Sequence, residues 1–332
     1  NVRGSDVSAA GAITVAAGND VNIAAATENR YEEHERREHK TSGINAIVSG
    51  ALALATGGPA VAGAVQNEMM TKKSKSSSTL KVTDDEFSVG SRLEAGGSII
   101  IAAGRRGAGA ARRPADEGSS APGSITVEGS SITSQSGGVP LAAENDVLIK
   151  EARERHSSLT QSRTRTKGAL TGKLNESRTL AEQDLAAGSM VSGNTVAIES
   201  GNDITVQGST VVGDGDVTLA AVRNVSIITA QETLHEEQEQ YKRRTGVSTS
   251  FGKGGVGATY GTTKQKSTNE VDIVNNIGSA VGSVSGGVSI TAGNDALITG
   301  SEILSATGTD ITARTVEINS AYNTMDARST FE

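Results

Sequence analysis

The sequence contains no cysteine and no tryptophan, and only 2% of its 332 residues are aromatic. The absence of cysteine excludes disulfide bonds, thiolate metal sites and cysteine nucleophiles. The shortage of aromatic side chains argues against a wide globular core, because such a core takes much of its bulk from aromatic and leucine side chains. With 40 glycines in the chain, the composition predicts a narrow core of Val, Ile and Ala.

An excess of positive charge is absent as well, since the formal net charge is −7 at pH 7. An acidic chain does not attract the phosphates of nucleic acids through its overall field. The sequence therefore predicts no nucleic-acid partner.

Short apolar alternations separated by Gly, Asn and Asp fill residues 193–227. Alternation with a period of two, bounded by turn-forming residues, indicates short half-buried strands. The pattern repeats after 21 positions, because Ile198 aligns with Leu219 and Val206 aligns with Ile227. A fixed period near 20 without a helical pattern predicts a β-solenoid.

The same period recurs near the end of the sequence, where Ile290 aligns with Ile311 and Leu297 aligns with Ile318. We expect about 7–8 coils, which at about 4.8 Å per coil give a shaft of about 35–40 Å. The fold prediction is an all-β solenoid formed by residues 1–332. Because the first residue, Asn1, already lies in a repeat, the sequence is also expected to be an internal segment of a longer repetitive protein.

Four non-solenoid excursions are predicted, at about 27–85, 104–123, 150–189 and 231–284. Three begin with a charged arm that contains histidine, as in ENRYEEHERREHK. These arms are either helical or paired strands, and the sequence leaves both alternatives open. For the first arm we expect ion pairs four residues apart, Glu32 with Arg36 and Glu33 with Arg37.

The segment from Gly246 to Gly254 superficially resembles a phosphate-binding loop, but its spacing does not match that motif. The alternation instead predicts a hairpin, with Val247, Thr249 and Phe251 on one strand and Val256, Ala258 and Tyr260 on the other. Phe251 and Tyr260 are candidate contact residues for a membrane or receptor, and a flap packed on the shaft is the alternative.

The motifs GNDVNI, ENDVLI, GNDITV and GNDALI each stand near a turn of the GSxV type. Together with the charged arms, they resemble the haemagglutinin-repeat region of filamentous-haemagglutinin-like exoproteins of the two-partner secretion pathway. In particular, the sequence resembles the second repeat region of CdiA-type contact-dependent growth-inhibition effectors, in which charged arms interrupt the repeats. The resemblance covers nearly the whole chain, except residues 44–65 and 104–123.

This resemblance implies a right-handed parallel β-helix, a hand also favoured by the general preference of parallel crossovers. It implies secretion through a two-partner secretion transporter to the cell surface of a Gram-negative bacterium. The implied partner is the surface or outer membrane of a target bacterium, which a non-catalytic filament module would engage or cross during toxin delivery. A haemagglutinin-type adhesin segment and a passive spacer are the alternatives, and the shaft is expected to be monomeric.

Asparagine recurs before the predicted strands, at Asn19, Asn145, Asn202, Asn224 and Asn294. These residues are predicted to be structural, because Asn tolerates left-handed backbone angles and its side chains can ladder between coils. The alternative is calcium binding, suggested by the segment GDGDV at Gly213–Val217, but this half-motif has no tandem partner.

The four histidines all lie in charged arms, without cysteine and at spacings unlike those of a zinc motif. We therefore predict no metal site and no cofactor. Enzymes bring reactive groups together in a cleft, whereas the acidic residues here fall mainly in turns and arms. No enzymatic activity is predicted.

A stretch without charges runs from Ile44 to Val65 and is long enough to span a bilayer on paper. Gly57-Gly58-Pro59 interrupts it, which favours docking against the solenoid over a single spanning helix. Insertion into a target membrane is the third interpretation. The candidate contact residues in this stretch are apolar: Ile44, Ile47, Leu52, Leu54 and Val61.

Overall fold

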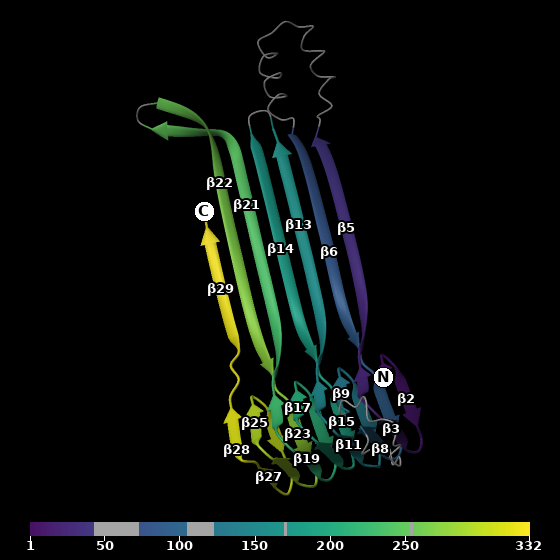
Figure 1. Cartoon of the computed structure of the whole chain (residues 1–332). Coiled ribbons are helices and arrows are strands. Elements are labelled where there is room, and N and C mark those ends of the chain that lie inside the picture. The colour runs from purple at the N-terminus through teal and green to yellow at the C-terminus, as the bar shows by residue number, and fades with distance from the viewer. Residues whose placement is uncertain (43–72, 105–122, 169–170, 253–254) are drawn as a thin grey trace, which may run out of the picture.

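The computed structural model describes residues 1–42, 73–104, 123–168, 171–252 and 255–332, and every regular element in these ranges is a β-strand. The chain winds into a parallel β-solenoid, from which a long antiparallel sheet projects (Figure 1). We call this projecting sheet the fin. The predicted all-β solenoid is confirmed.

Three parallel sheets form the sides of the solenoid. The first side contains β1 (Val2–Arg3), β4 (Val21–Ala24), β9 (Ile125–Glu128), β12 (Val147–Lys150), β17 (Ile204–Gln207), β20 (Val225–Ile228), β25 (Asp295–Thr299) and β28 (Thr315–Asn319). The second side contains β2 (Asp6–Ala9), β7 (Arg92–Ala95), β10 (Ser131–Ser134), β15 (Met190–Gly193), β18 (Thr210–Gly213), β23 (Ala280–Ser283) and β26 (Glu302–Leu304). The third side contains β3 (Ile13–Ala17), β8 (Ile99–Ala103), β11 (Val139–Ala143), β16 (Val196–Ser200), β19 (Val217–Ala221), β24 (Val288–Ala292) and β27 (Thr309–Thr312).

Each strand pairs in parallel with the equivalent strand one coil away. Ile198 lies opposite Leu219 and Val206 lies opposite Ile227, so the predicted 21-residue register is confirmed. All four side chains are fully buried.

The predicted alignment of Leu297 with Ile318 is wrong by one residue, because Ile298 pairs with Ile318. The last coil turns with two residues between Thr312 and Thr315, where the coil below uses three between its paired positions. In β25 the inward side chains are those of Ala296 and Ile298, so Leu297 points away from the core.

The core is a narrow column between the three sides, and its buried residues are all Ile, Val, Leu or Ala. Inward side chains alternate with outward ones along each strand, as in the buried positions of β16. Each fully buried Val, Leu or Ile side chain contributes about 1.5–3 kcal/mol. Stacked small aliphatic residues thus supply the stability that aromatic residues supply elsewhere, as the composition predicted.

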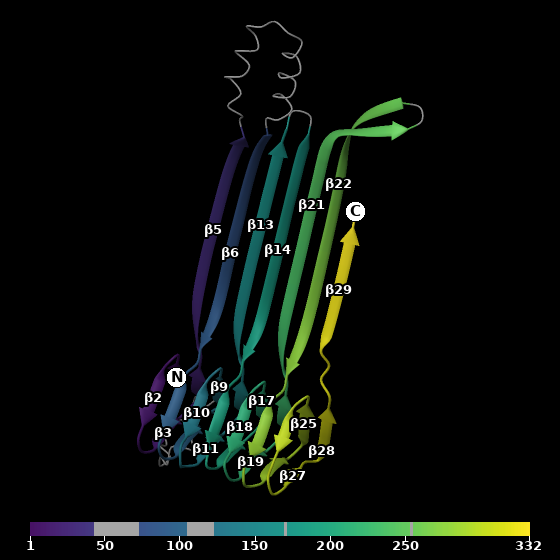
Figure 2. The same ribbon diagram turned by 180° about the vertical axis from the view of Figure 1, so that it is seen from behind.

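The fin is one antiparallel sheet in the spatial order β5–β6–β13–β14–β21–β22–β29. Its strands are β5 (Ala26–Ser42), β6 (Lys73–Val89), β13 (Ala152–Lys167), β14 (Gly172–Ala187), β21 (Ala230–Gly252), β22 (Gly255–Ile277) and β29 (Thr324–Phe331). At 16 residues, β13 extends about 50 Å. The strands rise side by side from the edge between the first and second sides (Figures 1 and 2).

Hairpins leave the solenoid at every second coil. The hairpins β5–β6, β13–β14 and β21–β22 follow β4, β12 and β20, whereas β9, β17 and β25 lead into short turns. Stacked coils and neighbouring sheet strands are both about 4.8 Å apart, so two coils rise by about the width of one hairpin. The hairpins therefore meet edge to edge, β6 with β13 and β14 with β21, and form one sheet.

A Gly-Ser pair closes each passage from the first side to the second. In the short turns the glycines have φ near +52°, a conformation that favours glycine: Gly4, Gly129, Gly208 and Gly300. A Cβ on Gly208 would lie 2.4 Å from Cβ of Ala230, the first residue of β21. Because Gly208 has no side chain and Ala230 has a small one, the first residue of β21 can pack directly against the turn of the neighbouring coil.

The serines of these pairs form a hydrogen-bonded ladder along the solenoid. The Ser189 amide donates to Ser209 Oγ (3.1 Å), and Ser189 Oγ donates to the carbonyl of Lys150 (2.7 Å). The amide-to-hydroxyl step repeats through Ser5, Ser91, Ser130, Ser189, Ser209, Ser279 and Ser301. The ladder satisfies buried polar groups at the line where the fin joins the solenoid.

Candidate contact surface on the fin

The fin presents two faces to solvent. Among its strand residues whose burial is described, only Ala152 and Ala230 at the base are buried. Residues directly opposite across strands share a face, and neighbours along a strand alternate between faces. The first face of the fin carries the row His39, Ser76, Arg165, Leu174, Arg243 and Lys264. The second face of the fin carries the row Lys40, Lys75, Thr166, Lys173, Arg244 and Thr263.

Charge is segregated along the length of the three hairpins. The half near the solenoid, which we call the proximal acidic band, comprises residues 27–35, 80–88, 153–161, 178–186, 231–239 and 268–276. It holds sixteen Asp and Glu against five cations: Arg30, Lys81, Arg153, Arg155 and Arg178.

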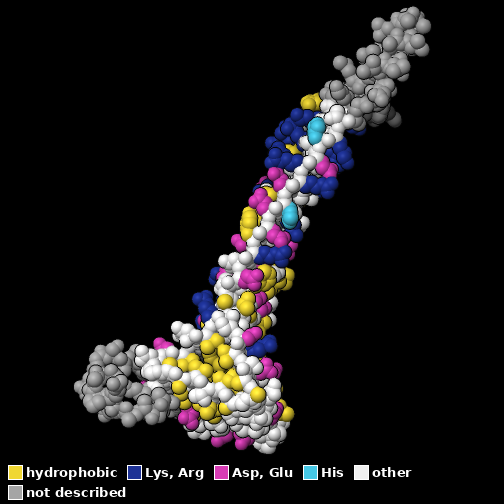
Figure 3. Space-filling view, turned by 90° about the vertical axis from the view of Figure 1, so that its right-hand side faces the viewer, with side chains coloured by type: hydrophobic (Ala, Val, Ile, Leu, Met, Phe, Trp, Pro, Cys, Tyr) yellow, Lys and Arg dark blue, Asp and Glu magenta, His cyan; other side chains and the backbone are white. Residues whose placement is uncertain are grey.

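The outer half, the distal basic band, comprises residues 36–42, 73–79, 162–167, 172–177, 240–245 and 262–267. It holds only two carboxylates, Glu38 and Glu176, against fourteen cations: Arg36, Arg37, Lys40, Lys73, Lys75, Arg163, Arg165, Lys167, Lys173, Lys242, Arg243, Arg244, Lys264 and Lys266. Figure 3 shows Lys and Arg gathered over the outer fin. An acidic protein thus carries a strongly basic end.

Most of these distal cations have no carboxylate partner. Arg36 and Lys40 pair with Glu38, Arg37 pairs with Glu35, Arg163 pairs with Glu176, and Lys266 pairs with Glu239. Within the described ranges, eight cations have no ion pair, four on each face: Arg165, Lys167, Arg243 and Lys264 on the first, and Lys75, Lys173, Lys242 and Arg244 on the second. Their mutual repulsion is uncompensated in the isolated chain, which favours an anionic partner.

The charged arms are strands, so the helical alternative is wrong. In a strand, residues two apart share a face at about 7 Å, whereas residues four apart are about 13 Å apart. Accordingly, Arg30 pairs with Glu32 and Arg37 pairs with Glu35, and the predicted pairs four residues apart do not form.

Two of the histidines bond to aspartates on neighbouring strands. His156 Nδ1 lies 3.1 Å from Asp85 Oδ1, and the ring of Phe87 meets the imidazole edge-on, with ring centres 5.0 Å apart. His235 Nδ1 lies 2.6 Å from Asp272 Oδ1. The hydrogen bond to Asp272 raises the pKa of His235 above its usual value, against an opposing effect of burial.

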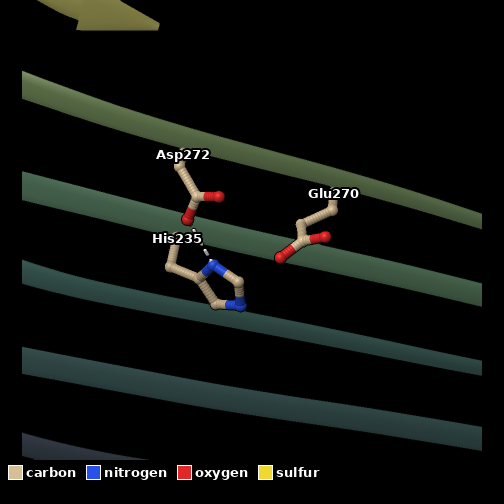
Figure 4. A group of neighbouring side chains, drawn as sticks. All are labelled: His235, Glu270 and Asp272. Carbon is tan, nitrogen blue, oxygen red and sulfur yellow. Dashed lines mark hydrogen bonds and ion pairs between the residues drawn. The ribbon is translucent and has the colours of Figure 1, made fainter. Parts of the chain in front are cut away.

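In the described ranges, His235, Asp272 and Glu270 form the one group of three His and carboxylate residues whose ligand atoms all lie within 4.8 Å of one another (Figure 4). A metal ion would need an unprotonated imidazole nitrogen. The hydrogen bond to Asp272 occupies Nδ1 and raises the pKa of the ring, so a metal ion would have to bind through Nε2 in competition with a proton. The group is best described as an ion pair within the proximal acidic band.

The five asparagines predicted to be turn residues lie before first-side strands, and none of them adopts the left-handed backbone that asparagine tolerates. Among the described residues, only glycines have positive φ. The side chain directly before each strand instead accepts a hydrogen bond from the next coil. Asp146 Oδ1 accepts from the Asp203 amide (3.2 Å), and Asp203 Oδ1 accepts from the Asn224 amide (3.0 Å). Asn224 Oδ1 continues the series to the Asp295 amide (3.3 Å).

In this series of hydrogen bonds between coils, Asn224 occupies the position that aspartate occupies in the neighbouring coils. Asn145 and Asn202 stand one residue earlier and also bond to Asp146, through Nδ2 at 2.9 and 2.6 Å. In the GDGDV segment, Asp216 Oδ1 accepts a bond from the Gly287 amide (2.9 Å). The structural assignment of the asparagines stays a prediction.

The hairpin predicted beyond Gly246 is confirmed, because Val247 pairs with Tyr260, Thr249 with Ala258 and Phe251 with Val256. Tyr260 is 66% exposed. The other candidate contacts, Ile44, Ile47, Leu52, Leu54 and Val61, lie outside the described residues, as does all but the two end residues of the excursion predicted at 104–123. The described ranges hold no helix with the length and apolarity to span a membrane.

The sequence prediction missed the distal basic band. A signal was present, because each arm runs from Glu-rich to Lys/Arg-rich in the outward direction, as in QETLHEEQEQYKRR. Only the antiparallel pairing, which returns segments such as KQKST beside it, places the basic ends together.

Comparison with known proteins agrees with this architecture of interrupted parallel coils. The model of the hemagglutinin repeat family matches residues 1–84, 69–177 and 170–330. The chain therefore belongs to the hemagglutinin repeat family, and within it the repeat region is of the CdiA type. The resemblance described from the sequence motifs is confirmed.

The relatives are CdiA proteins of Gram-negative bacteria. The chain is 34% identical over 200 residues to the tRNA nuclease CdiA-2 of Burkholderia pseudomallei, covering 60% of this chain and 6% of that protein. It is 35% identical over 150 residues to the toxin CdiA of Yersinia pestis, covering 45% and 4%. It is 30% identical over 209 residues to the tRNA nuclease CdiA of Escherichia coli STEC_O31, covering 62% and 6%. No solved structure matches the chain.

Proposed function

We propose that this chain is a non-catalytic module of a secreted bacterial exoprotein that engages the outer membrane of a target cell during contact-dependent toxin delivery. A two-partner secretion transporter would export it to the surface of a Gram-negative bacterium. The nuclease and toxin activities named for the relatives are properties of proteins of which this chain matches only a few per cent. We assign the chain to delivery rather than to the toxin activity.

The observation that carries this proposal is the fin. A passive spacer needs only the solenoid, in which each coil pairs with the next and the rod is stiff. The fin adds seven paired strands whose two exposed, charged faces extend to about 50 Å from the solenoid. Such a surface is suited to contact with another cell.

The solenoid register defines a chain without hairpins. We call a coil plain when a short turn, and not a hairpin, connects its first and second sides. Ile228 pairs with Gln207, so Gly278 in the hairpin-bearing coil corresponds to Gly208 in the plain coil. Deleting residues 229–277 joins Ile228 to Gly278-Ser279 and turns the coil into a plain one. Deleting residues 25–89 and 151–187 converts the other two hairpin-bearing coils into plain coils in the same way. The new junctions are in register because Ala24 and Lys150 both pair with Glu128 of a plain coil.

The test compares the full chain with this triple deletion in co-sedimentation with outer-membrane vesicles from target cells. We expect the full chain to bind and the triple deletion to lose binding while it retains its β-sheet circular dichroism. Binding that survives the deletion would refute a role for the fin. A full chain that does not bind at all would favour the spacer.

Protease added after binding distinguishes engagement from crossing. A fin that becomes protected inside the vesicles indicates that it crosses the membrane. A bound fin that stays fully cleavable indicates an adhesin segment.

A further inference from the structure

We infer that the distal basic band is a binding surface for the phosphate groups of an anionic membrane, into whose headgroup layer the fin inserts end-on. The inference rests on the proposed function, because it specifies which chemistry of the target envelope the fin recognises.

The unpaired cations lie at distances that suit phosphates. On the first face, Arg165 and Arg243 stand in one row with Leu174 between them. Their strands are two positions apart, which separates their backbones by about 10 Å. Long guanidinium side chains at this spacing can converge on one phosphate, and Arg binds phosphate through paired N–H groups.

Small hydroxyl residues separate the cations. On the first face Arg165 of β13 lies beside Ser76 of β6, and on the second face Thr166 lies beside Lys75. Side chains of this size leave the phosphate oxygens access to the cations and add hydroxyl donors. Two adjoining shallow hollows on the first face share Arg163 and Arg165 in their walls.

The two-faced distribution favours a membrane over a nucleic acid. A rod-like polyanion can contact only one face of a flat sheet, but four unpaired cations lie on each face. Sequence-independent binding of single strands also uses aromatic stacking, and Tyr241 is the one aromatic residue in the distal basic band. A thin sheet that enters a headgroup layer end-on brings both faces to phosphates at once.

The proximal acidic band sets the orientation. Its sixteen carboxylates are repelled by the surface that attracts the distal cations, so the field favours a fin that stands on the membrane over one that lies flat. At physiological salt this discrimination acts within a Debye length of about 8 Å. It is therefore strongest at contact.

The experiment measures binding of the full chain to phosphatidylcholine vesicles with and without phosphatidylglycerol. Three variants with equal charge change are compared: R165Q/R243Q/K264Q on the first face, K75Q/K173Q/R244Q on the second face, and R30Q/K81Q/R155Q in the proximal acidic band as the control. One cation near an anionic membrane contributes about five-fold in affinity, so each distal triple should weaken binding about 100-fold. The control should bind as the wild type does.

Equal loss in the control triple would show that net charge, not the distal basic band, determines binding, and would overturn the inference. Failure of the wild type to prefer the anionic vesicles would overturn it too. Inorganic phosphate at matched ionic strength should compete only weakly; full displacement by free phosphate would indicate an ion site instead. Tighter binding to a DNA duplex than to vesicles would indicate a nucleic-acid surface.

Outer-membrane vesicles separate this inference from the proposed function. Wild-type binding to them that the distal triples leave unchanged would preserve target engagement and reject phosphate recognition. Binding to anionic lipid vesicles without binding to outer-membrane vesicles would reject target engagement and preserve phosphate recognition.

Discussion

Replacing Gly208 by alanine tests how the fin is joined to the solenoid. Gly208 has φ of +52°, where an L-residue costs about 1–2 kcal/mol. The new Cβ would lie 2.4 Å from Cβ of Ala230, which is fully buried, and overpacking at such a site costs about 1–3 kcal/mol. We therefore expect G208A to destabilise the chain by about 2–5 kcal/mol.

The assay is guanidinium unfolding followed by circular dichroism, with hydrogen exchange to locate the effect. G11A is the matched control, because a Cβ on Gly11 meets no atom within 4 Å and its φ is not left-handed. The double variant G208A/A230G removes the collision but keeps the backbone strain, so it should recover part of the loss. A G208A chain as stable as G11A would refute the reasoning.

Three further outcomes are expected. S189A removes a buried donor to Lys150 and an acceptor of the Ser130 amide, and should lower the free energy of unfolding by about 1–3 kcal/mol. The control S289A, at a partly exposed position that points outward from β24, should lower it by less than about 0.5 kcal/mol. NMR titration should give His235 a pKa above 6.5, and D272N should lower that pKa because it removes the largest cause of the shift. Because that pKa is raised on folding, its small stabilisation is present below pH 6.5 and is lost as the pH rises through the raised value.

Much of the solenoid could be predicted from the sequence because its coils are local in sequence. Ile198 and Leu219 are one period apart, so alternation and repeat length alone define their contact. The prediction failed at Leu297, where one turn is a residue shorter and the apolar pattern offers two adjacent candidates, Leu297 and Ile298. A one-residue slip reverses which side chains enter the core.

The fin could not be assembled from the sequence in the same way. Its pairs join segments such as Arg165 and Ser76, 89 positions apart, and polar strands carry little signal for their partner. Two stacked coils rise by about the width of one hairpin, and this match follows from the geometry of stacked strands. No sequence motif encodes it. The basic end was hidden for the same reason, since net charge averages over bands that only folding separates.

The alternation of plain and hairpin-bearing coils is the central claim, and a one-coil deletion tests it most directly. Removing residues 204–224 joins Asp203 to Val225 and leaves a solenoid in register, because Ile204 pairs with Val225. It also places hairpins β13–β14 and β21–β22 on adjacent coils, about 4.8 Å apart. Each two-stranded hairpin needs about the rise of two coils, so the space available is about half of what the four strands need. Removing residues 204–295 deletes two coils with one hairpin, keeps the alternation and serves as the control.

Hydrogen–deuterium exchange across the fin is the measurement. We predict that the one-coil deletion loses protection in one of the two crowded hairpins while the solenoid amides stay protected. The two-coil deletion should keep β14 protected, now beside β29. A one-coil deletion whose whole fin is protected as in the parent chain would contradict the account.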